Sequence, residues 1–129
     1  MSDIVDLVDV ARRAAAGSYS PYSGFRVGAA VRTEDGTVFS SANVENAAYP
    51  VSQCAEANVV NYAVSQGHRV LPVIAVACID AATVDEAYPC GRCRQIMSEF
   101  GVETIHVTTA AGELRRHTLD DLLPHRFTL

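Results

Sequence analysis

The stretch Cys54-Ala55-Glu56 and the later stretch Pro89-Cys90-Gly91-Arg92-Cys93 gather three of the four cysteines of this sequence around one glutamate. Three thiolates can bind zinc and leave its fourth tetrahedral position open to water, whereas a structural zinc site is normally closed by four protein ligands. Glu56 lies too close to the first cysteine to bind the same ion easily, but it can hold and shuttle the proton of that water. The pattern therefore predicts a catalytic zinc site.

Both stretches are expected to begin a helix. One helix is predicted over 53–66, with Ser52 as its N-cap, and a shorter helix over 91–100. Cys90 and Cys93 then lie on one face, because residues three apart are neighbours on a helix. Helix N-termini carry free N–H groups and a partial positive charge, and both stabilise thiolates.

Other uses of these cysteines remain open from the residues alone. A lone Cys-x-x-Cys is often half of a structural zinc site or a redox pair. Cys78 could close the site as a fourth ligand, although its place within an apolar run is more typical of a small core residue. A thioredoxin-type motif would leave Cys54 and Glu56 without a function.

Composition limits the possible classes of protein. The chain has 129 residues, of which 49% are hydrophobic, enough for one domain with its own core. Its formal net charge is −5 and it has no run of basic residues, which argues against binding to nucleic acid phosphates. Asp3, Asp6 and Asp9 make the N-terminus unlike a secretory leader, and no apolar run reaches the ~20 residues of a membrane span. We therefore expect a cytoplasmic protein, in which thiols stay reduced and clustered cysteines bind metal.

The order of the expected elements predicts a mixed sheet with helices on both faces. Besides the two helices above, an amphipathic helix is expected over 3–16, capped by Ser2 or Asp3, and a helical turn over 119–123. A hairpin with Asp35-Gly36 at its turn joins the first two strands. The expected strands cover 25–33, 37–42, 71–79, 104–108 and, as a short fifth strand, 114–118.

Four motifs follow one another along most of the chain. They are Pro21-Tyr22-Ser23-Gly24-Phe25-Arg26-Val27-Gly28-Ala29-Ala30, Asn43-Val44-Glu45-Asn46-Ala47-Ala48-Tyr49, Cys54-Ala55-Glu56 and Pro89-Cys90-Gly91-Arg92-Cys93-Arg94-Gln95. In this order they resemble the motifs of the small, homotetrameric cytidine deaminases. The resemblance implies an α/β/α sandwich with a mixed five-stranded sheet, as a single domain over residues 1–129. It also implies zinc-dependent hydrolysis of cytidine or deoxycytidine to uridine or deoxyuridine and ammonia, in pyrimidine salvage.

Carried over to this sequence, the resemblance implies one zinc ion per subunit. Cys54, Cys90 and Cys93 would bind that ion, and Glu56 would be the proton shuttle.

The same resemblance implies the substrate contacts. Phe25 would pack against the pyrimidine, and the backbone of Ala55 would contact the base. Asn43 and Glu45 would hydrogen-bond the ribose 3′-hydroxyl. Phe127 would reach the pocket of a neighbouring subunit, because active sites in this family are completed across the homotetramer. Without the motifs, Phe25 would be interpreted as a core residue, Asn43 and Glu45 as part of a polar loop, and Phe127 as an anchor on its own subunit.

The chain departs from the family pattern at three positions beside the expected pocket. Ala57 stands where an arginine commonly offsets the thiolate charge, so we expect helix dipoles, with Arg94 as a further candidate, to supply that compensation. Pro50 replaces the usual glycine, and Gln53 is unusual just before the first ligand. These departures bear on the identity of the substrate more than on the chemistry.

Three alternatives to a nucleoside deaminase follow from the residues. A deaminase of the same fold could act on another aminated heterocycle, such as a blasticidin-type aminonucleoside. A deaminase of polynucleotides is disfavoured by the acidic charge. The alternative from another class is a non-catalytic zinc-stabilised module, against which Glu56 argues, because a structural site has no use for that carboxylate.

Overall fold

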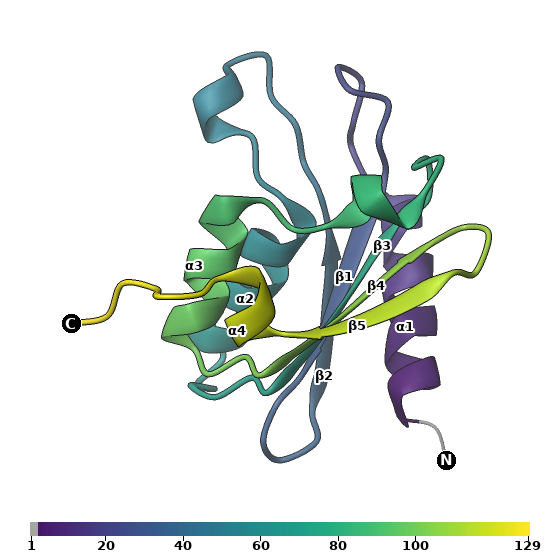
Figure 1. Cartoon of the computed structure of the whole chain (residues 1–129). Helices are drawn as coiled ribbons and strands as arrows, with labels where there is room; N and C mark the ends of the chain where they lie inside the picture. The colour runs from purple at the N-terminus through teal and green to yellow at the C-terminus, as the bar shows by residue number, and fades with distance from the viewer. Residues whose placement is uncertain (1–2) are drawn as a thin grey trace.

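The computed structural model describes the backbone of residues 3–129 and the side chains of residues 6–129, so the predicted caps of the first helix lie outside the described side chains. Its helices are α1 (Asp3–Ala14), α2 (Ala55–Ser65), α3 (Gly91–Glu99) and α4 (Leu119–Leu122) (Figure 1). Its strands are β1 (Val27–Arg32), β2 (Val38–Ala42), β3 (Val73–Cys78), β4 (Thr104–Thr109) and β5 (Leu114–Thr118). Within these residues, no helix has the length and apolar character that crossing a membrane requires.

The five strands form one mixed sheet in the order β2-β1-β3-β4-β5, which confirms the predicted sheet. β1 pairs antiparallel with β2 and β3, β3 pairs parallel with β4, and β5 lies antiparallel to β4 at the edge. The turn between β1 and β2 is the predicted hairpin. Gly36 has a φ of +89° there, which glycine adopts without strain, and the Thr33 N–H donates to the Thr37 carbonyl at 2.9 Å.

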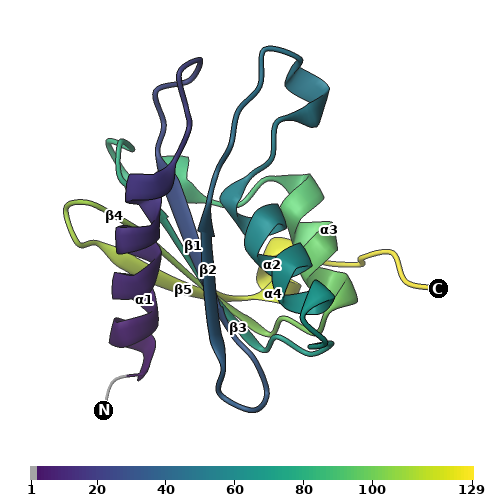
Figure 2. The ribbon, with the colours of Figure 1, turned by 180° about the vertical axis from the view of Figure 1, so that it is seen from behind.

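Helices cover both faces of the sheet, as predicted (Figures 1 and 2). On one face, buried side chains of α1 pack on the small alanines of β1 and β3. The other face carries α2, α3 and α4 over a larger apolar core. Five of the six residues of β3 are buried, which explains the near-continuous apolar run of its sequence. β3 is thus the central strand, and its end at Cys78 pairs with the start of β1 at Val27.

Gly28 allows α1 to lie close against β1. A Cβ at this position would lie 2.0 Å from the carbonyl oxygen of Ala11 and 2.5 Å from the backbone nitrogen of Ala15. A larger residue would therefore push α1 off the sheet. Because the loop before β1 leaves the end of α1 and enters the sheet at this contact, the contact also helps to place that loop.

The structure differs from the prediction mainly at the ends of elements. Ser52 is not the N-cap of α2: Cys54 is, and the Ser52 hydroxyl instead accepts the N–H of Asn46 at 2.9 Å. The cap is decided by which residue keeps an extended backbone while its carbonyl accepts the first helical bond, and Cys54 does both. Two of the connections between the expected elements contain short 3-10 helices, at Tyr49–Val51 and Val84–Ala87.

Candidate active site

The three predicted ligand cysteines meet at one point although they are far apart in the sequence. The Sγ atoms of Cys54, Cys90 and Cys93 all lie within 4.8 Å of one another, and those of Cys54 and Cys90 are 4.0 Å apart. All three are free thiols. Cys78 does not belong to this group, so a closed site of four cysteines has no support in the described residues. Three converging thiols without a fourth fit a catalytic zinc ion.

Two helix starts produce this convergence. Cys54 is the N-cap of α2 and Cys90 is the N-cap of α3, and neither helix has a side-chain cap hydrogen bond. The first-turn N–H groups and the positive ends of both helix dipoles therefore face the thiols. Cys93 lies one turn into α3 and is fully buried, whereas Cys90 is exposed, so the site runs from the surface into the core.

The thiols influence one another strongly. The Cys93 thiol hydrogen-bonds to Cys54, and this bond is the main reason why the pKa of Cys54 falls to about 6; Arg92 contributes in the same direction. The pKa of Cys93 is raised, because it is the donor of that bond and because it is buried. Cys54 is therefore ready to bind a metal as a thiolate near neutral pH.

Glu56 lies in the first turn of α2 and is 95% buried, with a relative exposure of 5%. Burial raises the pKa of its carboxyl to about 7, and the charge of Cys54 acts in the same direction. A carboxyl that titrates near neutrality can both take up and release a proton, as a general acid and base must.

A cavity of about 170 Å³ opens beside this carboxyl. It brings together most of the residues that the sequence predicted for the site. Its walls are formed by Phe25, Val27, Asn43, Cys54, Ala55, Glu56, Cys78, Glu86, Ala87, Tyr88 and Cys90.

Three of the predicted site residues do not line this cavity, and one of them is Cys93, the fully buried predicted ligand described above. Glu45 lines a smaller adjoining cavity of about 130 Å³, which it shares with Asn43 and Cys54. Phe127 lies on the C-terminal tail, beyond α4, and is 66% exposed (Figure 1). It is therefore not an anchor on its own subunit.

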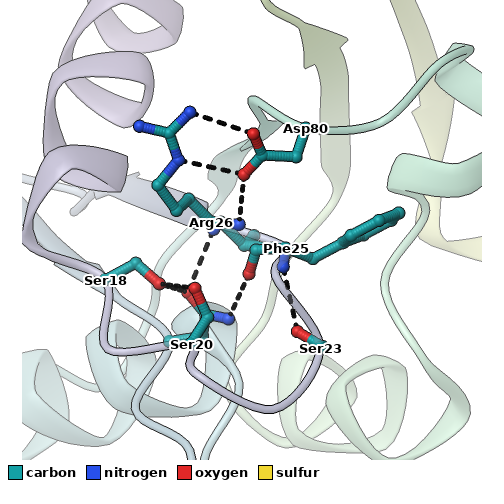
Figure 3. A network of polar contacts seen from close by, with 8 residues as sticks. Ser18, Ser20, Ser23, Phe25, Arg26 and Asp80 are labelled. Atoms are coloured by element: carbon teal, nitrogen blue, oxygen red, sulfur yellow. Dashed lines mark hydrogen bonds and ion pairs between the residues drawn. The ribbon is translucent and has the colours of Figure 1, made fainter.

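A network of polar contacts fixes the backbone around Phe25 (Figure 3). The Phe25 N–H donates to Ser23 Oγ at 3.0 Å, and the neighbouring Arg26 donates from its backbone N–H and its Nε to Asp80 Oδ2, both at 2.9 Å. Arg26 also donates from its Nη2 to Asp80 Oδ1 at 2.9 Å, so the ion pair is bidentate. The Phe25 ring points away from this network.

Asn43 also holds this loop, a function that the sequence analysis missed. Its Oδ1 accepts from Ser18 Oγ at 2.5 Å and from the Val27 N–H at 3.0 Å, while its Nδ2 donates to the Phe25 carbonyl at 2.8 Å. Both acceptor sites of the amide oxygen are thus used, and one N–H of Nδ2 is left for a ligand. The partners come from two other segments of the chain, so no local sequence pattern could have indicated them.

Glu45 is held in a similar way. Its carboxylate accepts from the N–H groups of Tyr22 and Ser23 and from Ser23 Oγ. The hydrogen bond from the Ser23 side chain is the main reason why the pKa of Glu45 is lowered. Glu45 therefore stays ionised and ties the loop that carries Phe25 to the loop before α2.

Tyr88 is a pocket residue that the sequence analysis did not single out. Its hydroxyl lies 2.7 Å from Nε2 of His117 on β5, and the two rings are 5.2 Å apart. β5 thereby supports the pocket wall. The only sequence signal was the position of Tyr88 directly before Pro89, which does not indicate a contact with β5.

Arg94 donates to two backbone carbonyls, which lends no support to its predicted part in offsetting the charge of the thiols. Its Nε donates to the Pro89 carbonyl at 2.8 Å and its Nη1 to the Leu122 carbonyl at 2.7 Å. Arg94 therefore ties the start of α3 to α4.

Comparison with known proteins agrees with this site. Residues 1–109 match the family described as the cytidine and deoxycytidylate deaminase zinc-binding region. A cytidine deaminase of Sporosarcina psychrophila is 38% identical over 98% of this chain and 92% of that protein. The crystal structure of cytidine deaminase from Burkholderia pseudomallei superposes with a TM-score of 0.89 at 38% identity, covering 98% of this chain and 100% of that one. This chain belongs to the cytidine and deoxycytidylate deaminase family, and its cofactor is zinc.

A more distant relative bears on the substrate. Blasticidin-S deaminase of Bacillus cereus is 32% identical over 79% of this chain and 76% of that protein.

Proposed function

We propose that this chain catalyses the hydrolytic deamination of cytidine and deoxycytidine to uridine and deoxyuridine, with release of ammonia. The observation that carries the proposal is the buried carboxyl of Glu56, which lines the same cavity as Cys54 and Cys90. A structural zinc site has no use for a buried carboxyl whose pKa is about 7. An enzyme that moves protons at neutral pH requires one.

When bound by Cys54, Cys90 and Cys93, zinc supplies Lewis acidity that makes water nucleophilic near neutral pH. The oxygen of the water forms a bond to C4 of the cytosine ring, and the bond from C4 to the exocyclic nitrogen breaks. Glu56 accepts the protons of the water and delivers one to ring N3 and one to the leaving amine, which departs as ammonia. A carboxyl with a pKa of about 7 suits both directions of transfer.

The nucleoside is held by the loops around the cavity. Phe25 packs against the pyrimidine and the backbone of Ala55 contacts the base. Asn43 offers its remaining N–H, and Glu45 its carboxylate, to the ribose 3′-hydroxyl; both residues line the adjoining cavity. A site built to hydrogen-bond a sugar hydroxyl discriminates strongly against molecules without it. These contacts favour a nucleoside over free cytosine.

We further propose that the enzyme is a cytoplasmic homotetramer of pyrimidine salvage, with active sites shared between subunits. Two loops beside the pocket carry exposed apolar side chains that water would otherwise surround. They are Tyr19, Tyr22, Val44, Tyr49 and Val51. The rings of Tyr22 and Tyr49 contact each other edge to face at 6.2 Å, so these side chains gather on one surface. A second copy of the chain would cover this surface.

Phe127→Ala is expected to raise the KM for cytidine about threefold to tenfold, because the exposed ring would be lost from the pocket of a neighbouring subunit. The fold of its own subunit should not change, since the side chain is exposed. Steady-state kinetics measure the KM for cytidine, and light scattering measures whether the size of the assembly is unchanged. Leu129→Ala, on the same tail and also exposed, is the matched control. An unchanged KM for Phe127→Ala would show that the tail takes no part in binding.

Asp80→Ala is expected to raise the KM for cytidine about threefold to tenfold, with a smaller change in kcat, because Arg26 loses the partner that orders the backbone next to Phe25. Asp80→Asn keeps an acceptor and should lose less. The control is Asp9→Ala, which breaks the ion pair with Arg12 within α1. Equal losses in Asp80→Ala and the control would contradict a link to Phe25.

The proposed function is tested by incubating the zinc-loaded protein with cytidine, deoxycytidine, cytosine and blasticidin S. Release of ammonia and the change in ultraviolet absorbance report turnover. We expect turnover of both nucleosides and none of the free base. Turnover of blasticidin S alone would assign the site to another amine, and no turnover with zinc bound would favour a non-catalytic module.

A further inference from the structure

Besides the contacts among the thiols, a side-chain hydrogen bond joins the two segments that carry the zinc ligands. Arg92, between Cys90 and Cys93, donates from its Nη2 to Oε1 of Gln53 at 2.8 Å. Gln53 directly precedes Cys54. The bond therefore spans the start of α2 and the start of α3, which are otherwise separated by all of α2 and β3 in the chain.

The same arginine is a cation within the second ligand segment. Three thiolates and one zinc ion leave one net negative charge. Arg94 is bound to backbone carbonyls of Pro89 and Leu122, and Ala57 is fully buried in the apolar core. The Arg92 guanidinium, in contrast, is bound to the side chain of Gln53, the residue directly before Cys54.

We propose that Arg92 and Gln53 form a strap that holds the two ligand segments together and places a positive charge beside the zinc thiolates. This inference rests on the assignment of the three cysteines as zinc ligands. Gln53 suits the strap because its amide oxygen orients the guanidinium without neutralising it, which a carboxylate in its place would do. Arg92 is a positioning residue, since it acts through the ligands and not on the substrate.

The test is the rate at which the zinc-loaded protein loses its metal to the chromogenic chelator 4-(2-pyridylazo)resorcinol. Because Arg92 is exposed, the effect is moderate: Arg92→Gln and Gln53→Ala are each expected to release zinc about twofold to fivefold faster than the wild type. The double variant should release it no faster than Arg92→Gln alone, because both changes break the same bond. The difference from wild type should shrink in high salt, which screens exposed charges.

Two further variants separate the loss of positive charge at Arg92 from the effect of replacing any exposed arginine. Arg92→Lys keeps the charge and is expected to release zinc more slowly than Arg92→Gln; equal rates would overturn the electrostatic part of the proposal. Arg13→Gln removes an exposed arginine of α1, on the opposite face of the sheet, and should release zinc like the wild type.

The strap and the ligand assignment fail in different ways. Zinc release at the wild-type rate in both Arg92→Gln and Gln53→Ala would overturn the strap. A double variant whose increase in release rate equals the product of the two single increases would overturn it as well. A wild-type protein that binds no zinc would overturn the assignment of the ligands instead.

Discussion

Replacing Glu56 with glutamine is expected to reduce the turnover of cytidine at least about 100-fold while zinc stays bound. Glutamine has nearly the same size and fills the same buried position, but it cannot accept a proton from water. The measurement is steady-state kinetics together with the zinc content of the purified variant. Glu99→Gln, at the exposed end of α3, is the matched control and should retain wild-type turnover. Turnover of Glu56→Gln within a few-fold of the wild type would exclude Glu56 as the proton carrier.

The stability of the same variant gives a second readout, in the metal-free protein. Burial raises the pKa of Glu56 to about 7 from its ordinary value of 4.5, so the folded state binds the proton more tightly than the unfolded state. The stabilisation that protonated Glu56 gives to the folded state is fully present at pH values below the pKa of this carboxyl in the unfolded state. It is lost as the pH rises through the higher pKa that the carboxyl has in the folded state. Metal-free Glu56→Gln should therefore be more stable than metal-free wild type at pH 8, and equally stable near pH 4. Thermal unfolding at both values measures the difference, and lower stability of the variant at pH 8 would contradict the cause assigned to the shift.

Cys93→Ala is expected to abolish turnover by removing zinc. The affinity for zinc should fall by more than about 100-fold. Replacing a residue that only hydrogen-bonds to a metal ligand already reduces metal affinity by about 10–100-fold, and Cys93 is itself one of the proposed ligands. The variant, and the wild type treated with a chelator, should also melt at a lower temperature than the zinc-loaded wild type, since a ligand that binds only the folded state stabilises it. Metal analysis, kinetics and thermal unfolding measure these effects.

The matched control for zinc content is Cys78→Ala. This thiol lines the pocket but lies outside the group of three, so the variant should retain one zinc ion per chain. Loss of zinc from Cys78→Ala would restore the alternative of a closed site with four cysteines. Full zinc content in Cys93→Ala would remove Cys93 from the ligands.

Much of the fold could be predicted from local patterns. A run of apolar residues predicted the buried strand β3. The dipeptide Asp35-Gly36 predicted the turn between β1 and β2. The cap of α2 could not be predicted in this way. Ser52 and Cys54 are both placed to cap a helix, and only the folded backbone shows that the Cys54 carbonyl accepts the first helical bond while the Ser52 hydroxyl binds Asn46.

The sequence by itself determined the chemistry of the site: three thiols for zinc, a carboxyl two residues from one of them, and the order of the motifs around them. Residue types and short spacings carry that information, because both ligand motifs lie at the start of a helix. The tertiary structure alone decided what surrounds these groups. The pKa of Glu56 is raised because its carboxyl is buried in the folded protein. The side-chain amide of Asn43 is hydrogen-bonded to the backbone around Phe25. Arg92, near the start of α3, donates a hydrogen bond to Gln53, just before the start of α2. Such contacts join residues that are distant in the chain, so they exist only once β1 and β3 pair and place α2 and α3 side by side on one face of the sheet.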